Sequence, residues 1–318
     1  MESRQKRVMM LDPGFRTIEG RGEFPDAARF SYSSPDLPLL QQAVIRAVEL
    51  AGGQRRLKQL YDDQRRGRLE GESFFDAAIR FLALEVRFDQ EALRAVPASG
   101  PVVFVANHPY GVLDGIVLAA LALRVRPETK ILANDVLYRV PETRAHLLPV
   151  AFGETRQSLA INVASRRAAQ AWLAEGGAIG IFPGGGVATS ERVFSRPVYD
   201  LPWHPFTAKL VSAARATVVP IHFHGQNSRL FQIASHLSLT LRLSLLFRET
   251  TRRIGTRVDV TIGEPVAFEA LEAYRDKAAL TGELRRRTYA LAPTAEFDWM
   301  RQGRIRGSSR FRRKQAST

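Results

Sequence analysis

The stretch Val102-Val-Phe-Val-Ala-Asn-His-Pro-Tyr-Gly-Val-Leu-Asp-Gly115 decides the fold of this chain. It opens with a continuous β-branched and aromatic run, which is typical of a strand that a parallel sheet covers on both faces. Pro109 and Gly111 predict a turn, and the apolar run from Ile116 to Leu123 predicts a buried helix. In open α/β sheets the chemistry lies beyond the carboxyl ends of the strands, so we expect a functional site at this turn.

His108 and Asp114 are the candidate catalytic pair of that turn. A neutral imidazole can accept a proton from a hydroxyl group, and a carboxylate on its other nitrogen fixes the tautomer and stabilises the imidazolium. The two residues are six positions apart, which is about 240° of rotation on a regular helix. They therefore meet only if the turn folds back, which Gly111 permits. The alternative is a turn histidine whose hydrogen bonds are satisfied and an aspartate that only caps the helix.

The motif Asn107-His-Pro-x-Gly-x-x-Asp-Gly115 resembles the His–Asp box of the glycerolipid and lysophospholipid acyltransferases. Five residues separate His108 from Asp114. This is one more than in the commoner form, and it resembles the branch of ornithine-lipid acyltransferases and hemolysin-like proteins. The resemblance implies that His108 and Asp114 are catalytic and that Asn107 belongs to the substrate site. In that family the acceptor hydroxyl attacks a thioester, so no acyl-enzyme is needed.

Two further blocks follow in the family's order. The strand predicted for Leu147–Phe152 is followed by Arg156, where the family places an Arg that holds the acceptor's phosphate. The glycine-rich loop Phe182–Ser190 resembles the family's Phe-Pro-Glu-Gly-Thr-Arg-Ser block. Backbone N–H groups of such a loop can approach an anion or an oxyanion closely. The loop therefore provides three candidate substrate-binding residues, Gly184, Gly185 and Gly186.

That loop departs from the family's pattern at two positions. Gly184 stands where the family has Glu, and Val187 stands where it has Arg. The loss of both charges favours an acceptor other than lysophosphatidate. Arg192 and Arg196 follow closely in the sequence and are candidates for partial compensation.

The fourth block is the strand Thr217–Gly225, which has an internal proline. His222 and His224 alternate onto one side of it and are predicted to contact the substrate. A His-x-His pair can bind a metal, but no further ligands with convincing spacing are found, so no metal site is expected. The apolar segment Leu230–Leu246 follows, and two interpretations stay open. It is either a buried core helix or an amphipathic element that wets the membrane and lines an acyl tunnel, which the resemblance favours.

Composition limits the remaining possibilities. The chain has 318 residues, 45% of them apolar, with a net charge of +14 and no cysteine, which excludes disulfides and thiolate sites. The N-terminus is polar, so no signal peptide is predicted. No apolar run reaches the roughly 18 residues that span a bilayer. The excess of arginine predicts an anionic partner, and the basic run Arg301–Lys314 predicts a disordered tail that an anionic membrane attracts. No nucleic-acid motif appears.

These observations predict an α/β fold with a mixed, largely parallel sheet flanked by helices. Residues 1–95 are predicted to form a helical region that is either a lid or membrane hairpin, or simply a layer closing the core. Residues 96–295 form the predicted acyltransferase domain, and 296–318 the tail.

The predicted function is transfer of a fatty acyl chain from acyl-acyl carrier protein or acyl-CoA to a hydroxyl group of a lyso-lipid, without a further cofactor. We expect it in the cytoplasm, at the inner face of the membrane. The alternatives are a hydrolase using the same pair and a basic, non-catalytic surface-binding protein.

Overall fold

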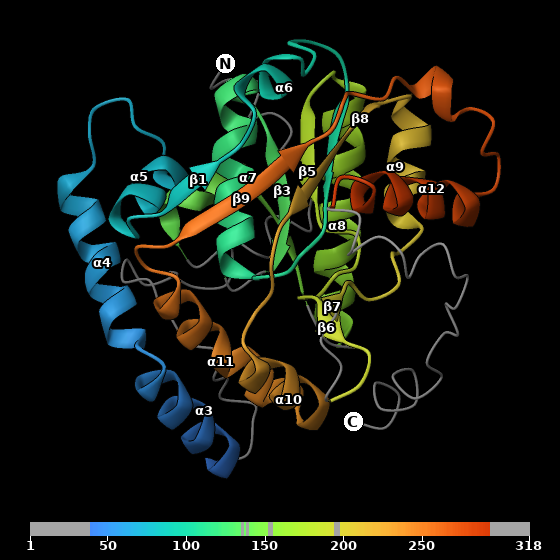
Figure 1. Ribbon diagram of the computed structural model, residues 1–318. Helices are drawn as coiled ribbons and strands as arrows, with labels where there is room; N and C mark the ends of the chain where they lie inside the picture. Colours follow the sequence, from blue (N-terminus) through green and yellow to red (C-terminus); the bar gives the residue numbers. More distant parts are fainter. Residues whose placement is uncertain (1–38, 135–136, 138–139, 152–154, 194–197, 293–318) are drawn as a thin grey trace.

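The computed structural model describes residues 39–134, 137, 140–151, 155–193 and 198–292 (Figure 1). The predicted basic tail lies outside the described residues, as do the first 38 positions, Phe152 and Arg196.

A seven-stranded sheet forms the centre of the fold, in the order β1-β9-β8-β2-β5-β3-β4. Its strands are β1 Glu85–Arg87, β2 Val102–Ala106, β3 Lys130–Asn134, β4 Leu147–Val150, β5 Ala178–Ile181, β8 Thr217–Phe223 and β9 Arg257–Ile262. β2 is parallel to both of its neighbours, β5 and β8, whereas β9 runs antiparallel to β8. The predicted mixed, largely parallel sheet is therefore confirmed. A separate two-stranded sheet pairs β6 with β7, which span Thr189–Ser190 and Val198–Tyr199.

Helices cover both faces of the sheet (Figure 1). They are α3 Leu39–Ala51, α4 Gln54–Gly67, α5 Phe74–Phe81, α6 Gln90–Arg94, α7 Val112–Val125, α8 Arg156–Ala174, α9 Phe206–Ala214, α10 Arg229–Leu237, α11 Leu239–Arg252 and α12 Lys277–Tyr289, with short 3₁₀ turns at Pro141–His146 and Phe268–Leu271. α7 leads from β2 to β3 and α8 leads back from β4 to β5. Because such crossovers are right-handed, opposite directions of travel place α7 and α8 on opposite faces.

β2 and α7 form the middle of the hydrophobic core. Every residue of β2 is buried, as expected for a strand covered on both faces. In α7 the run from Val117 to Ala122 is at most 1% exposed, so this helix is buried almost all round. The site at the end of β2 is therefore built on two elements that the core holds rigidly.

The structure corrects the predicted boundaries in two places. The segment Leu230–Leu246 was predicted as one element, but it contains α10 and the larger part of α11, separated at Ser238. The Ser238 side chain accepts the N–H of Leu241 and thereby caps α11. The sequence also predicts a final helix over residues 271–291, whereas this helix begins at Lys277 in the structure, because Asp276 caps it there.

The helices α3, α4 and α5 form a layer along one edge of the molecule (Figure 1). α3 packs against α11, and α4 packs against both α5 and α11. The strand β1 also lies within the first 95 residues, but it pairs with β9 and so belongs to the main sheet. Within the described part of the chain, none of the helices has the length and apolar character that crossing a bilayer requires.

Candidate active site

His108 and Asp114 lie against each other at the carboxyl end of β2. The chain turns at Gly111, which has a φ of 87° and directly precedes α7. A positive φ of this kind favours glycine. The turn brings Asp114, in the first turn of α7, back toward the histidine, and 3.1 Å separates Asp114 Oδ1 from His108 Nδ1. The predicted fold-back is present, whereas the catalytic roles of the pair stay predictions.

The carboxylate of Asp114 is completely buried and is held by the backbone. Its Oδ2 accepts the N–H of Tyr110 at 2.8 Å, and its Oδ1 accepts the N–H of Gly115 at 3.0 Å. These donors fix the orientation of the carboxylate before any substrate arrives. The His108 Nδ1 contact has the distance of a hydrogen bond but not its alignment. Catalytic hydrogen bonds often align only once substrate is bound.

The imidazole ring of His108 is partly accessible. It stacks on the ring of Phe182, with 4.1 Å between the ring centroids. The His108 side chain is 17% exposed, although its Nδ1 atom is buried. The accessible surface therefore belongs to the other ring atoms, among them Nε2. This leaves Nε2 as the nitrogen available to a hydroxyl group.

Asp200 is a buried residue of this site that the sequence analysis missed. Its Oδ1 accepts the backbone N–H of His108 at 3.0 Å, and its Oδ2 accepts the Nε1–H of Trp203 at 2.9 Å. Burial raises the pKa of the Asp200 carboxyl, and the two hydrogen bonds act in the opposite direction. Asp200 thus fixes the backbone that carries the histidine. The sequence signal was weak, a lone acid after Tyr199, because its partner lies 92 residues away.

The glycine-rich loop lies directly beside the histidine. The N–H of Ala188 donates to the carbonyl oxygen of His108 at 2.7 Å. A Cβ atom on Gly184 would lie 3.0 Å from the Cβ of Asp200, so a larger residue there would displace the loop or the aspartate. The structure therefore brings the third predicted block, the glycine-rich loop, to the His–Asp pair.

The three glycine amides of the loop are not equivalent. The N–H of Gly185 donates to the carbonyl oxygen of Phe182 at 3.0 Å, so a turn already uses it. Gly185 also has a φ of 66°, which explains the glycine. Over the described part of the chain, no partner is found for the N–H groups of Gly184 and Gly186. These two amides are the ones that remain for an oxyanion.

Three of the predicted substrate-binding residues lie where β2 and β8 end. They are Asn107 directly after β2, His222 in β8, and His224 directly after β8. The Asn107 side chain donates to the carbonyl oxygen of Phe223 and accepts its N–H, so it ties the ends of the two strands together. The rings of His222 and His224 lie 4.9 Å apart, which agrees with their predicted position on one side. His222 also packs against Tyr289. These contacts are structural, and the substrate contacts predicted for the three residues stay predictions.

Arg156 is the first residue of α8 and is exposed. Thr155 caps this helix, and residues 152–154 before it lie outside the described part of the chain. It follows β4, which lies three strands away from β2 in the sheet. At the usual spacing between strands that is about 14 Å. Arg156 could therefore bind an acceptor whose hydroxyl group lies at His108 only if that acceptor spans this distance. Its predicted contact with the substrate stays a prediction.

Arg242 of α11 is the cation that the structure places at the glycine loop. Its guanidinium donates to the carbonyl oxygen of Val187, the position where the resembled family has an arginine. A Cβ atom on Gly186 would lie 3.6 Å from Arg242 Nη2. Burial lowers the pKa of Arg242 to about 10. Of the two arginines predicted to compensate, Arg192 is exposed and Arg196 lies outside the described residues.

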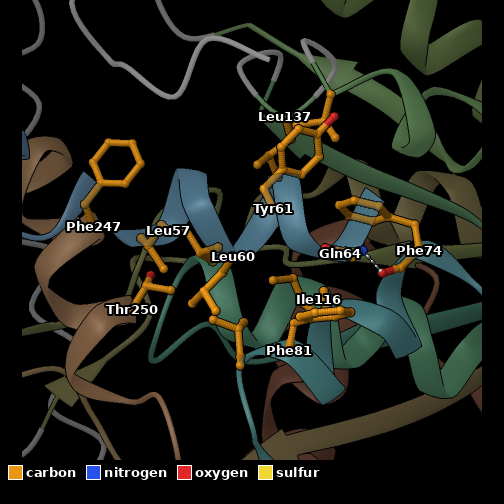
Figure 2. A pocket seen from close by; sticks show the side chains of 14 residues that line it. Leu57, Leu60, Tyr61, Gln64, Phe74, Phe81, Ile116, Leu137, Phe247 and Thr250 are labelled. Atoms are coloured by element: carbon orange, nitrogen blue, oxygen red, sulfur yellow. Dashed lines mark hydrogen bonds between the residues drawn. The ribbon is translucent and has the colours of Figure 1, made fainter. Parts of the chain in front are cut away.

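An apolar pocket opens next to the first turns of α7 (Figure 2). The space between its walls, including open solvent at the mouth, is about 820 Å³. Residues of α4, α5, α7 and α11 contribute to its wall. The lining residues are Leu57, Leu60, Tyr61, Gln64, Phe74, Ala78, Phe81, Leu82, Val112, Ile116, Leu137, Val140, Phe247 and Thr250. Val112 and Ile116 share one face of α7, whereas Asp114, two positions from each of them, points to a different face of the same helix. The segment Leu230–Leu246, which was expected to line an acyl tunnel, contributes none of these residues. Helix α11 reaches the pocket only with Phe247 and Thr250, which follow that segment.

The acyltransferase family matches residues 67–296, which is most of the chain. The chain belongs to the acyltransferase family. The resemblance predicted from the His–Asp box is thus confirmed, and so is the prediction of an enzyme that transfers acyl groups.

Two proteins of known function resemble this acyltransferase. The lyso-glycine lipid O-acyltransferase of Phocaeicola vulgatus is 26% identical over 217 residues, which cover 65% of this chain and 74% of the relative. The protein of the same name from Bacteroides thetaiotaomicron is 25% identical over 217 residues, covering 65% and 75%. Among solved structures, the 1-acyl-sn-glycerophosphate (LPA) acyltransferase PlsC from Thermotoga maritima matches with 14% identity and a TM-score of 0.43 over 91% of this chain and 95% of the other.

Proposed function

We propose that this acyltransferase moves a fatty acyl group from a thioester to the hydroxyl group of a lyso-lipid that carries an amino acid. The observation that carries the proposal is the His108–Asp114 pair, fixed 3.1 Å apart at the carboxyl end of β2. The relatives' name, lyso-glycine lipid O-acyltransferase, supports an amino-acid lyso-lipid as acceptor. The absence of charge at Gly184 and Val187 agrees with an acceptor other than lysophosphatidate.

In the proposed reaction His108 is the general base. Its Nε2 takes the proton from the acceptor hydroxyl group while the hydroxyl oxygen attacks the carbonyl carbon of the thioester. The new C–O bond turns the carbonyl oxygen into an oxyanion, for which the amides of Gly184 and Gly186 are the candidate donors. When the C=O bond re-forms, the C–S bond breaks and the imidazolium returns its proton to the thiolate. Asp114 orients the ring and stabilises the imidazolium.

The apolar pocket is the proposed site of the acyl chain. Its wall is almost entirely apolar, and α4, α5, α7 and α11 supply most of the side chains drawn in Figure 2. A long hydrocarbon chain is stabilised in such a space by about 0.8 kcal/mol for each buried CH₂ group. Val112 and Ile116 come from the same first turns of α7 as Asp114, and we propose that the thioester end of a bound chain passes around this end of the helix to reach His108.

Acyl carrier protein and coenzyme A are the proposed carriers of the donor. An acidic carrier protein and an anionic membrane both complement a chain of net charge +14. We therefore propose that the enzyme works at the inner face of the membrane, where lyso-lipid acceptors are found.

The test uses the purified full-length protein, lyso-glycine lipid in anionic vesicles, and either acyl-CoA or acyl-acyl carrier protein. Mass spectrometry follows the lipid and the free fatty acid. The expected result is an O-acylated lipid that forms only when donor and acceptor are both present. Release of fatty acid at the same rate without acceptor would instead identify a hydrolase, and no consumption of thioester with any lyso-lipid would refute the enzymatic proposal.

A further inference from the structure

Arg242 is a buried arginine in an apolar environment. It is 6% exposed, and its guanidinium carbon lies 5.8 Å from the centroid of the Phe231 ring. The hydrophobic cluster around it includes Val187, Leu245 and Leu246. Burying a guanidinium in such surroundings is costly unless a carboxylate or several carbonyl oxygens accept its hydrogen bonds. Within the described part of the chain, no carboxylate forms an ion pair with Arg242, and the carbonyl oxygen of Val187 is its single acceptor.

Arg126 shows how this protein satisfies a buried arginine whose role is structural. Arg126 is 3% exposed, and it pairs with Glu128 at 2.7 Å. Its guanidinium also donates to the carbonyl oxygens of Pro97, Gly100 and Gly176. A guanidinium has five N–H donors. Arg126 donates four hydrogen bonds, whereas Arg242 donates one to the described residues. Arg242 therefore has N–H groups left to donate to another partner.

A second buried donor lies on the helix next to Arg242. Gln232 of α10 is 4% exposed, and its Oε1 accepts the N–H of Ser190 at 2.9 Å. Its Nε2 is buried and finds no hydrogen-bond partner among the described residues. A buried amide nitrogen left in this way normally indicates a missing partner. α10 and α11 pack against each other, and each brings a buried donor to the segment 187–190.

That segment lies between these donors and the catalytic histidine. Ala188 donates its N–H to the carbonyl oxygen of His108. A Cβ atom on Gly111 would lie 2.9 Å from Val187 Cγ2 and 3.0 Å from Leu246 Cδ2, so the His108 turn, the loop and α11 meet here. An anion held by Arg242 would therefore belong to a molecule that reaches the active site.

We infer that Arg242, assisted by Gln232 of the neighbouring helix, binds the carboxylate of the acceptor's amino-acid head group. The inference rests on the proposed function. A carboxylate is planar and accepts two parallel N–H bonds from one guanidinium fork. A phosphate monoester carries more charge, and the loop itself supplies no second cation, because Gly184 and Val187 are uncharged. An amino acid that is linked to its fatty chain through the amino group keeps the carboxylate that this site needs.

The test compares two acceptors that differ only in this group: an N-acyl amino-acid lyso-lipid with a free carboxylate, and its primary amide. We expect the wild type to prefer the carboxylate by roughly ten- to a hundred-fold in kcat/KM, which is the usual strength of a hydrogen bond to a charged group. Arg242→Gln should lose this preference, mainly through a higher KM for the carboxylate acceptor. Arg252→Gln, an exposed arginine on the same helix, is the matched control and should keep the preference.

Each outcome decides something. Equal use of both acceptors by the wild type, faster use of lysophosphatidate than of the carboxylate, or an unchanged preference in Arg242→Gln overturns the inference and leaves the proposed function standing. Failure of the wild type to acylate any lyso-lipid removes the proposed function, and the inference with it. If circular dichroism shows that Arg242→Gln is unfolded, Arg242→Lys decides: it keeps the charge but not the fork, and the preference should fall but not disappear. A preference equal to that of the wild type would overturn the inference.

Discussion

Replacing Asp114 with asparagine tests how the carboxylate acts on His108. The carboxylate accepts the N–H of Tyr110 on one oxygen, while the other oxygen accepts the N–H of Gly115 and contacts His108 Nδ1. Asparagine offers only one oxygen. If that oxygen takes the Tyr110 bond, its NH₂ group faces Nδ1 and the N–H of Gly115; if it takes the other position, its NH₂ group faces the N–H of Tyr110. Neither orientation satisfies every group.

The first orientation has a direct chemical consequence. An NH₂ group that donates to Nδ1 stabilises the tautomer with the proton on Nε2, and that tautomer cannot accept a proton from the acceptor. We expect kcat to fall by roughly 10²–10⁴, the usual contribution of a positioned general base. KM should change little, because Asp114 is completely buried and therefore out of reach of an acceptor. An unsatisfied buried N–H should also lower the free energy of unfolding by about 1–3 kcal/mol.

The assay is the initial rate of acyl transfer at several acceptor concentrations, together with thermal unfolding. Asp76→Asn is the matched control. Asp76 pairs with Arg124 of α7 at 2.7 Å but is partly exposed and far from the histidine in sequence, so its loss should change stability by less than about 1 kcal/mol and leave kcat unchanged. A folded Asp114→Asn enzyme with a kcat within threefold of the wild type would refute the assigned role. So would a loss that appears only in KM.

Three further predictions concern the pocket, the turn and the sheet. Ile116→Trp should fill part of the apolar pocket, so competition among acyl donors of different length should shift the products toward shorter chains; an unchanged product distribution would exclude the pocket as the acyl site. Gly111→Ala places a Cβ atom at a φ of 87° and 2.9 Å from Val187 Cγ2, which should cost about 1–3 kcal/mol of stability by thermal or chemical unfolding; a variant as stable as the wild type would contradict the strain. Burial lowers the pKa of Lys130 to about 8 from 10.5, so the folded state binds fewer protons than the unfolded state between these values, and stability should rise by up to about 3 kcal/mol as the pH increases through that window. Lys130→Met should lack this rise, and an identical pH dependence in both proteins would show that Lys130 titrates normally.

The sequence predicted the parts of this protein that local patterns encode. β2 was recognisable because its five residues are apolar without interruption, and α7 because its run is apolar on nearly every face. The meeting of His108 and Asp114 was foreseeable because the intervening Gly111 could adopt the backbone conformation that the fold-back needs. Each of these features is determined by residues that are close together in the sequence.

The parts that sequence reasoning missed depend on distant residues. Asp200 reaches His108 across 92 positions, and Arg242 reaches Val187 across 55. Neither lies in a motif. The break at Ser238 also escaped detection, because the apolar pattern continues through it and only the capping bond of its side chain reveals the new helix. The pocket combines four helices, and no single periodicity describes such a surface.

The central claim is that His108 removes the proton from the acceptor. The most direct test is single-turnover acyl transfer by His108→Ala, with folding verified by circular dichroism and with His146→Gln as a control. The ring of His146 contacts the carbonyl oxygen of Thr129. His146 directly precedes β4 and so lies at the amino ends of the parallel strands, whereas the site lies at the carboxyl end of β2. The account predicts that His108→Ala loses at least about 100-fold in the rate of transfer, while thermal stability and the activity of His146→Gln stay close to those of the wild type. A folded His108→Ala protein that transfers acyl groups at a near-normal rate would contradict it.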